Sequence, residues 1–396
     1  CVLTQYYPPE MGAPQARLSE LATRLSQRGW TVDVLTALPN YPSGRILDGY
    51  PRLRPVVEQR GVTKVARVPL YPSNTGFAKR LATYLSFAAS ASVAGPLLLR
   101  RPDLLWVESP PLFIGYAAWA LQALWRCPYV LNVSDLWPES AIRMGIVQEG
   151  AATKAAEQLE RALYARAAGV TGQSTGIIDG VRARCRNVAT EVITNGVDPI
   201  RFGPQHADDE ARRLVGPGPS FMYAGLFGYA QGLDQILDVA ARVPNARFVL
   251  VGDGPVRADL EARVASESLT NVRLLPPQPR ERIPALLACA DAALITLGMS
   301  IPGAVPSKIY EAMAASLPIV LVADGEPAAR VHDAGAGVAV DPGDAAGLEA
   351  AVQSLASDPA QRTKLGQAGR HAAETTYHRD QIAERLDVFL RSRLRS

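Results

Sequence analysis

The 396-residue sequence predicts an α/β protein built from two doubly wound domains in succession. Short apolar runs alternate with helical segments along nearly the whole chain, which is typical of parallel sheets covered by helices. A polar stretch at 199–210 and a glycine–proline run at 216–219 interrupt this series once. We therefore expect domains at 1–200 and 201–378 and a final helix within 379–396.

Composition narrows the functional classes. Apolar residues make up 48% of the chain, so each domain can bury a core of its own. The net charge of +3 is too small to favour nucleic acid as a partner. The four cysteines follow no metal or redox spacing, and no apolar run is expected to span a membrane. We therefore expect a cytoplasmic protein with no metal site.

The first domain is expected to open with a βαβ unit. Residues 1–5 read as a buried strand, and a turn-rich loop that contains Gly12 follows. The next helix carries Leu18 and Leu21 on one face, and 32–37 reads as the second strand. A glycine in such a loop lets the backbone approach a phosphate closely. Gly12 is thus a candidate binding residue, and an ordinary loop glycine is the alternative.

Two later segments of the first domain also have two interpretations. The polar and aromatic loop at 40–50 is either a mobile loop near a bound substrate or a plain connection. The helix expected over 76–99 begins with Lys79 and Arg80, has an apolar body and is followed by Arg100. Basic ends with an apolar body suit a membrane surface. A helix that faces the core gives the same pattern.

Acidic side chains follow one of the strands of the first domain. After a strand at 103–107, the apolar helix at 112–125 is too short to span a bilayer and is expected to lie buried on the sheet. The strand at 129–133 then leads to Asp135 and Glu139. Ligands of open parallel sheets bind beyond the carboxyl ends of strands, so both carboxylates stand where chemistry is expected. For Asp135 the alternative is a cap on the next helix.

A second strand–helix series follows the domain boundary. Its expected strands are 221–224, 248–251, 272–275, 292–297 and 319–322. Glycines close the first two strands, namely Gly225, Gly228, Gly252 and Gly254. Helices are expected over 345–356, 363–377 and 381–394, the last amphipathic and rich in arginine.

The segment 303–326 carries the most informative pattern. Ser307 is expected to cap a short helix at 308–315. Lys308 and Glu311 are three residues apart and project from nearly the same face of that helix. A cation and a carboxylate at a helix start suit a nucleotide diphosphate, with the lysine at the phosphates and the glutamate at the ribose hydroxyls. The alternative is an ordinary surface pair.

The motifs of the chain resemble those of a known family. Pro-Ser-Lys-Ile-Tyr-Glu-Ala-Met-Ala-Ala-Ser-Leu-Pro-Ile at 306–319 is similar to the donor-site segment of retaining glycosyltransferases of family GT4, which have the GT-B fold. This segment is closest to the subgroup that builds bacterial surface polysaccharides, and it resembles that of N-acetyl-L-fucosamine transferases of O-antigen synthesis. Asp-Leu-Trp-Pro-Glu-Ser at 135–140 matches the same subgroup. Asn-Gly-Val-Asp at 195–198 and Gly-Asp-Gly-Pro at 252–255 resemble further markers, so the resemblance covers nearly the whole chain.

The resemblance implies a fold and a set of site residues. It implies two Rossmann-like domains that face each other across a cleft, and a C-terminal helix that crosses back to the first domain. The implied nucleotide-sugar-binding residues are Gly12, Asn195, Gly225, Gly228, Gly252, Gly254, Arg257, Ser307, Lys308 and Glu311. The catalytic candidates are Asp135, Lys308 and Glu311, with Asp135 orienting or deprotonating the acceptor.

The sequence departs from the family pattern at three positions. Many members carry Glu where Gly303 stands, and Arg and Lys where Leu226 and Gln231 stand. These departures remove side chains that elsewhere hold the sugar and the diphosphate. The chain has no Asp-x-Asp metal motif, which fits enzymes that stabilise the leaving diphosphate with helix dipoles and cations.

We therefore expect retaining transfer of a sugar, of N-acetylhexosamine type, from a UDP-sugar to a lipid-linked saccharide. The expected location is cytoplasmic, with the inner face of the bacterial membrane as a further partner. One alternative is a non-hydrolysing UDP-sugar 2-epimerase, but that reaction needs several acid/base groups and the four histidines lie outside the motifs. The other is a nucleotide-sugar-binding subunit without activity.

Overall fold

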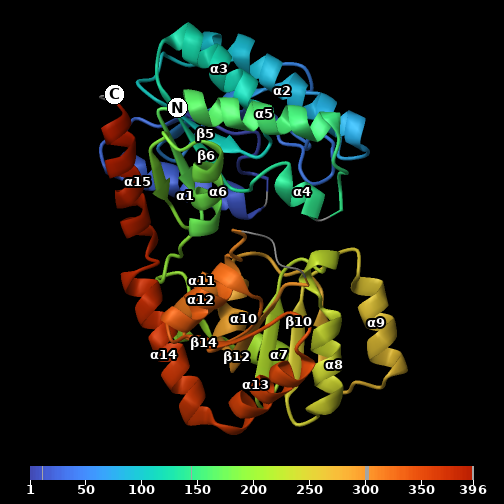
Figure 1. Cartoon of the computed structure of the whole chain (residues 1–396). Helices are drawn as coiled ribbons and strands as arrows, with labels where there is room; N and C mark the ends of the chain where they lie inside the picture. The colour runs from blue at the N-terminus through green and yellow to red at the C-terminus, as the bar shows by residue number, and fades with distance from the viewer. Residues whose placement is uncertain (11, 144, 299–302, 395–396) are drawn as a thin grey trace. The chain divides into compact units, whose positions relative to one another are not determined.

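The structure is a computed structural model that describes residues 1–10, 12–143, 145–298 and 303–394 (Figure 1). The chain divides into two compact units, which we call the first and the second domain. Cys1–Thr194 with Asp380–Ser396 forms the first, and Asn195–Arg379 forms the second. The boundaries expected from the sequence lie after residues 200 and 378.

The first domain contains an eight-stranded sheet in the order β3-β4-β2-β1-β5-β6-β7-β8. Its strands are β1 (Val2–Leu3), β2 (Asp33–Ala37), β3 (Val56–Arg60), β4 (Thr63–Val68), β5 (Leu105–Ser109), β6 (Tyr129–Val133), β7 (Gly169–Gly172) and β8 (Thr190–Val192). All neighbours are parallel except β3 and β4, which form an antiparallel hairpin at the edge. The sequence patterns did not predict this hairpin.

Helices cover both faces of the first sheet. They are α1 (Ala13–Gln27), α2 (Phe77–Leu98), α3 (Ile114–Trp125), α4 (Glu139–Arg143), α5 (Ala151–Arg166), α6 (Thr175–Arg184) and α15 (Arg379–Arg393). Side chains of α2, α3, α5 and α6 share one apolar core, and those of α1 and α15 share another on the opposite face. Figure 1 shows α2, α3 and α5 gathered together, apart from α15.

The last helix of the chain belongs to the first domain, as predicted. Ile382, Leu386 and Leu390 of α15 are buried with Leu18 of α1 and Val34 of β2. The apolar face of the helix expected over 381–394 is therefore buried in a core formed mainly by the beginning of the chain. The prediction that this helix crosses back to the first domain is confirmed.

Helix α2 corrects the expectation that no apolar segment is long enough to cross a membrane. With 22 residues, α2 has the length and composition of a spanning helix, and no other helix in the described ranges does. It nevertheless packs on the sheet through Phe87 and Ala91, which are buried. Its outer face exposes Phe77, Val93 and Leu97. The helix is thus part of the first domain but carries an apolar outer surface.

The second domain contains a six-stranded, wholly parallel sheet in the order β11-β10-β9-β12-β13-β14. Its strands are β9 (Ser220–Ala224), β10 (Arg247–Val251), β11 (Val272–Leu275), β12 (Ala292–Thr296), β13 (Ile319–Val322) and β14 (Gly337–Val340). This is the strand order of a dinucleotide-binding Rossmann fold. The two doubly wound α/β domains predicted from the sequence are therefore confirmed.

Helices again cover both faces of this sheet. They are α7 (Asp209–Val215), α8 (Asp234–Arg242), α9 (Arg257–Ser266), α10 (Ile283–Ala288), α11 (Lys308–Ala314), α12 (Gly325–Asp333), α13 (Ala345–Ser357) and α14 (Pro359–Thr375). One core joins α7, α10, α11, α12 and α14 to the sheet, and another joins α8, α9 and α13.

The strand order fixes where ligands can bind in each domain. In both sheets, successive strands are first added on one side of the first strand. The chain then crosses back, and the later strands are added on its other side. The reversal lies between β1 and β5 in the first domain and between β9 and β12 in the second. Open sheets bind ligands at the carboxyl ends of the strands that flank such a reversal.

Candidate functional site

Lys308 and Glu311 lie at the reversal point of the second domain. Helix α11 buries Ile309 and Met313 in the core and turns Lys308 and Glu311 towards the sheet. Both residues line a small cavity whose other lining comes mainly from β9 and β12. The spacing on one helix face that the sequence predicts is therefore present, and it faces the strands where a ligand is expected.

The Lys308 ammonium sits against aromatic and glycine surfaces. Its Nζ atom is 3.8 Å from the centroid of the Tyr223 ring, a cation–π distance. A Cβ atom at Gly225 would lie only 2.4 Å from this Nζ, so the glycine leaves the space that the ammonium occupies. Burial lowers the pKa of Lys308 to about 8, because the charged form loses hydration there.

Glu311 is a carboxylate in the same poorly hydrated place. Burial raises its pKa, while the positive charges of Arg280, Arg379 and Lys308 act in the opposite direction. Among the described residues, Lys308 and Glu311 form no ion pair with each other, and no hydrogen bond to either charged group is found. Two opposite charges on one helix face are thus held apart, and both remain available to a ligand.

Ser307 does not act as the predicted cap. Its backbone already has helical angles, with φ −62° and ψ −23°, and its side chain makes no capping hydrogen bond. A capping residue normally has extended angles that turn its hydroxyl back towards the first helical amides. Ser307 instead accepts through its backbone carbonyl from the amides of Tyr310 and Glu311. It is the entry residue of α11, and the prediction of a side-chain cap is wrong.

Two glycine loops pack against each other beside Lys308. The amide of Phe227 donates to the carbonyl of Asp253 at 2.8 Å. A Cβ atom at Gly252 would lie 1.9 Å from the carbonyl oxygen of Gly225, and one at Gly254 would lie 2.4 Å from that of Phe227. Only glycine permits this approach. Gly252 and Gly254 therefore shape the loop that carries Gly225.

Two further predicted binding residues have other partners in the structure. Nη1 of Arg257 donates to the carbonyls of Gly252 and Leu275 at 2.7 and 3.2 Å, and its Nε donates to Glu261 at 2.7 Å. This guanidinium holds the loop in place. At Gly228, a Cβ atom would lie 2.5 Å from Oε1 of Gln231, so the glycine makes room for that amide.

Asn195 lies where the chain enters the second domain. Its carbonyl accepts from Nε of Arg379 at 3.3 Å, and that of Gly196 accepts from Nη2 at 2.8 Å. Gly196 has φ +56°, a conformation that glycine adopts without strain. The Asn-Gly-Val-Asp segment thus pairs with the segment through which the chain leaves this domain.

Gly12 and Asp135 line one pocket of about 510 Å³ in the first domain. The pocket lies at the ends of β1, β5 and β6, beside the strand reversal. The rings of Tyr6, Tyr41 and Tyr84 also line it. Gly12 has an extended backbone, but a Cβ atom there would lie 2.2 Å from Oε1 of Gln15, which lines the same pocket. The structure thus brings the two predicted residues together.

Asp135 is half-buried, and its Oδ2 atom accepts a hydrogen bond from the hydroxyl of Ser140 at 2.8 Å. Burial raises the pKa of Asp135, and the hydrogen bond from Ser140 partly offsets this. Glu139 is engaged elsewhere, because it forms ion pairs with Arg184 at 2.6 Å and Arg143 at 3.0 Å. A carboxylate with a raised pKa in a pocket is suited to accept a proton.

A buried polar network beneath this pocket was not predicted. Glu108 is 4% exposed and pairs with Arg17 of α1 at 2.6 Å. Its other oxygen accepts from Asn132 of β6 at 2.8 Å, and the hydroxyl of Ser134 also donates to Glu108. A Glu directly after the strand expected at 103–107 was the available signal, and β5 in the structure includes it. The network ties α1, β5 and β6 together beside Asp135.

The described residues contain no group of three or more His, Cys, Asp and Glu side chains arranged to hold a metal ion.

Two family models match the chain in succession. The glycosyl transferase 4-like domain matches residues 12–196, and the glycosyl transferases group 1 model matches residues 205–372. The first covers the pocket with Asp135, and the second covers the glycine loops and α11.

Named proteins similar to this chain include two of nearly equal length. An Escherichia coli (strain K12) protein named as a colanic acid biosynthesis glycosyl transferase, WcaI, is 28% identical over 344 residues, 80% of this chain and 81% of its own. The 2-deoxystreptamine glucosyltransferase of Streptomyces kanamyceticus is 25% identical over 381 residues, 90% of this chain and 92% of that protein.

Solved structures share the fold at lower identity. Sucrose-phosphate synthase from Thermosynechococcus elongatus has a TM-score of 0.77 at 20% identity, over 99% of this chain and 98% of that chain. HepE of Anabaena, in complex with UDP-glucose, has a TM-score of 0.74 at 17% identity, over 99% of each chain. With both family models matched in order over most of its length, the chain belongs to the glycosyltransferases of the group 1 and GT4-like type, and it has the GT-B fold.

Proposed function

We propose that this protein transfers an N-acetylhexosamine-type sugar from a UDP-sugar to a lipid-linked saccharide, with retention of the anomeric configuration. The nucleotide is supported by HepE, a structural neighbour solved with UDP and with UDP-glucose. The polysaccharide acceptor is supported by similarity to WcaI and by the resemblance of the motifs to N-acetyl-L-fucosamine transferases.

The unpaired charges of Lys308 and Glu311 are the observation that supports binding of the UDP-sugar donor. A UDP-sugar presents ribose hydroxyls and a diphosphate a few ångströms apart, and α11 presents a carboxylate and an ammonium on one face. Glu311 accepts hydrogen bonds from the ribose hydroxyls. Lys308 neutralises the charge that develops on the diphosphate as the glycosidic bond breaks.

The departures from the family pattern concentrate this duty on Lys308. Leu226 and Gln231 stand where many relatives have basic residues, and neither side chain carries a charge. Leu226 is 61% exposed and contributes its carbonyl to the Tyr223 hydroxyl at 2.7 Å. The ammonium of Lys308 is therefore the cation that the proposal assigns to the diphosphate.

The pocket of Asp135 is the proposed binding site of the acceptor saccharide. Aromatic rings with a few placed polar groups are typical of small-molecule sites, and three tyrosines line this one. Asp135, with its raised pKa, orients the acceptor hydroxyl and takes its proton.

A transfer assay tests the proposed function. The protein is incubated with UDP-N-acetylhexosamine and a lipid-linked saccharide, and product and donor are separated and identified. Formation of a glycoside with the donor's anomeric configuration is expected. An isomerised donor without transfer would instead indicate an epimerase, and donor binding without any reaction would indicate a binding subunit.

Removal of Glu311 tests its assignment to the ribose. Glu311→Ala is expected to weaken UDP binding in calorimetry by about tenfold or more, because two hydroxyls lose a charged acceptor. Its circular dichroism spectrum is expected to match that of the wild type. Unchanged UDP affinity would remove Glu311 from the site.

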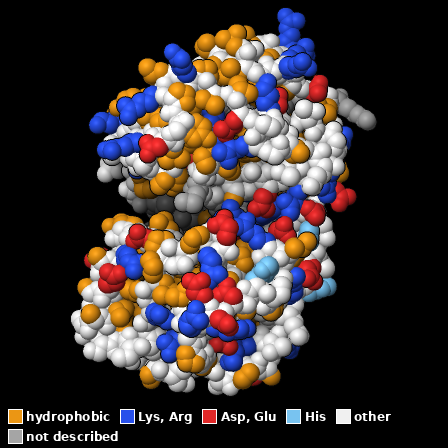
Figure 2. Space-filling model, turned by 180° about the vertical axis from the view of Figure 1, so that it is seen from behind, with side chains coloured by type: hydrophobic (Ala, Val, Ile, Leu, Met, Phe, Trp, Pro, Cys, Tyr) orange, Lys and Arg blue, Asp and Glu red, His pale blue; other side chains and the backbone are white. Residues whose placement is uncertain are grey.

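We further propose that the protein works at the cytoplasmic face of the membrane through α2. The outer face of α2 is apolar, Lys79 and Arg80 stand in its first turn, and Arg100 follows its end. Figure 2 shows hydrophobic and basic side chains intermixed on one face of the first domain. Such a surface suits anionic lipid.

Sedimentation with anionic vesicles at low salt tests the membrane proposal. The wild type is expected to pellet with the vesicles, and Lys79→Glu with Arg80→Glu to stay largely in solution. A wild type that remains wholly in the supernatant would contradict it.

A further inference from the structure

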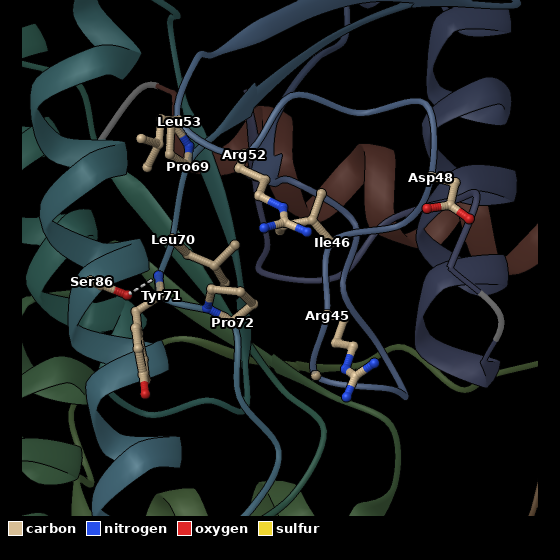
Figure 3. A pocket seen from close by; sticks show the side chains of 11 residues that line it. Arg45, Ile46, Asp48, Arg52, Leu53, Pro69, Leu70, Tyr71, Pro72 and Ser86 are labelled. Carbon is tan, nitrogen blue, oxygen red and sulfur yellow. Dashed lines mark hydrogen bonds between the residues drawn. The ribbon is translucent and has the colours of Figure 1, made fainter.

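A second and larger pocket lies in the first domain, with a volume of about 950 Å³ (Figure 3). Its lining comes from three segments: the loop from Gly44 to Leu53, the segment 69–72 that follows β4, and Ser86 of α2. The hydroxyl of Ser86 accepts from the amide of Tyr71 at 2.9 Å, which fixes the second segment to the helix. None of the predicted donor or catalytic residues lines this pocket.

The lining combines an apolar surface with two unpaired cations. Ile46, Leu70 and Pro72 contribute apolar side chains, and Leu70 is almost fully buried. The guanidinium groups of Arg45 and Arg52 make no hydrogen bond or ion pair with the residues that the structure describes. In Figure 3 both guanidiniums extend from the loop among the labelled lining side chains.

One carboxylate also lines the pocket but does not neutralise the arginines. Asp48 forms no ion pair with Arg45 or Arg52 within the described part of the chain. In Figure 3 it stands at the side of the view, apart from both. The lining thus has a net charge of one positive unit, with two donors each able to bind phosphate oxygens in bidentate fashion.

The pocket shares two segments with the pocket of Asp135. Tyr41 lines the smaller pocket and Gly44 the larger, on the same loop. On α2, Tyr84 lines the smaller pocket and Ser86 lines the larger one. The loop is held firmly, because Glu10 accepts from the amides of Asn40 and Tyr41 at 2.8 Å each. The two pockets are thus lined by neighbouring residues of one loop and one helix, and no described residue lines both.

We infer that the larger pocket binds the carrier end of the acceptor, an apolar chain that bears a phosphate or diphosphate. Arg45 and Arg52 bind the phosphate oxygens, and the side chains of Ile46, Leu70 and Pro72 contact the first part of the chain. The saccharide attached to that phosphate occupies the pocket of Asp135. This inference rests on the proposed function and adds to it the class of molecule that carries the acceptor.

The surroundings of the pocket agree with this occupant. Leu85 of α2, next to Ser86 in the chain, is 41% exposed, and Phe77 at the start of the same helix is 60% exposed. Leu53, at another edge, is 86% exposed. A chain longer than the pocket thus meets apolar surface where it emerges, which a free sugar phosphate would not use.

Binding of three small probes tests the chemistry without any enzymatic assay. Farnesyl diphosphate combines chain and anion, farnesol has the chain alone, and inorganic diphosphate has the anion alone. Calorimetry is expected to show binding of farnesyl diphosphate to the wild type, and about tenfold or weaker binding to Arg45→Ala with Arg52→Ala. Arg54→Ala is the matched control, because Arg54 is exposed on the same loop but does not line the pocket.

Two outcomes of the probe experiment would overturn the inference. Inorganic diphosphate that binds as tightly as farnesyl diphosphate would show a simple anion site. Phosphatidylglycerol vesicles that displace farnesyl diphosphate completely would assign the pocket to membrane lipid instead of the acceptor.

Kinetics separate the failure of this inference from failure of the proposed function. With a lipid-diphosphate-linked saccharide, the double variant is expected to raise the acceptor KM by about tenfold while the KM for the UDP-sugar stays unchanged. With a soluble saccharide acceptor, variant and wild type are expected to react alike. If the wild type transfers and the double variant matches it on the lipid-linked acceptor, the inference is wrong. If the wild type transfers to neither acceptor but the probe result holds, the proposed function falls and the pocket assignment stands.

Discussion

Lys308 holds a charge in a place that hydrates it poorly, and its environment provides an aromatic face but, among the described residues, no carboxylate within ion-pair distance. Burying a charge without a partner costs stability, and such groups gather at functional sites. The ammonium is thus prepared to gain a strong interaction when an anionic diphosphate arrives.

Loss of this ammonium is expected to affect the chemical step most. Lys308→Ala should lower kcat by roughly a hundred- to a thousandfold or more, because a donor aimed at developing charge is removed and the uncharged Leu226 and Gln231 stand where many relatives have basic residues. KM should change less. Lys308→Arg should recover only part of the rate, since its planar head cannot occupy the same point. Steady-state kinetics of both variants decide this, and a loss below about tenfold in Lys308→Ala would mean that another group neutralises the diphosphate.

The low pKa of Lys308 also predicts how UDP affinity depends on pH. The free protein holds this proton below about pH 8 and releases it above, and a bound diphosphate favours the protonated form. UDP binding should therefore take up a proton above about pH 8, and affinity should fall as the pH rises from there towards about 9. Calorimetry in two buffers of different ionisation enthalpy measures the uptake. Lys308→Arg is the control, since arginine stays charged throughout, and an equal fall in that variant would exclude Lys308 as the cause.

At the scale of elements, the glycine loops after β9 and β10 act as one unit with α11. Gly225 lies under the Lys308 ammonium, and Gly252 and Gly254 allow the loop of Gly225 to approach. Arg257, at the start of α9, donates to the carbonyl of Gly252 and so fixes the loop after β10. The position of the ammonium thus depends on contacts between two glycine loops and a helix that are distant in the sequence.

A methyl group at Gly225 is expected to displace the ammonium. Gly225→Ala places Cβ 2.4 Å from Nζ of Lys308, so the flexible lysine must move. UDP affinity should fall by about tenfold, the equivalent of one charge-assisted hydrogen bond. Gly343→Ala is the control, because Gly343 also has a positive φ but a Cβ atom there would meet nothing within 4 Å. If both variants lose affinity equally, backbone strain and not the lysine contact is responsible.

At the scale of the molecule, the end of the chain completes the core of its beginning. Residues of α15 are buried among side chains of α1, β1 and β2. Trp30 donates to Asp387 at 2.5 Å, and Arg24 pairs with Asp380 at 2.6 Å. The first domain therefore cannot complete its fold until the second domain has been synthesised.

Shortening one buried side chain of α15 should destabilise the first domain selectively. Leu386 is fully buried, so Leu386→Ala should cost about 2–5 kcal/mol of unfolding free energy. Val388 is 64% exposed on the same helix, and Val388→Ala should change stability by less than about 0.5 kcal/mol. Hydrogen exchange should show the loss in α1 and β1, and UDP should still stabilise the second domain. A loss of protection confined to the second domain would contradict this division of the chain.

The sequence by itself determined the elements with a clear period and the residues with a clear local role. Apolar runs and helical periodicity predicted most of the strands, both doubly wound sheets and the final helix. The spacing of Lys308 and Glu311 predicted their shared helix face, because that relation depends only on helix geometry.

The tertiary structure decided what depends on contacts between distant residues. The β3–β4 hairpin and β14 lie at sheet edges, where the apolar pattern is weak, so local periodicity missed them. Serine is a residue type that often caps helices, but the backbone of Ser307 has helical angles. The local sequence does not reveal those angles. Arg257 has a charge suited to bind phosphate, but its guanidinium donates hydrogen bonds to two backbone carbonyls that folding brings together. Glu108 finds Arg17 only across the assembled sheet, because a buried charge needs a partner and its place in the sequence does not name one.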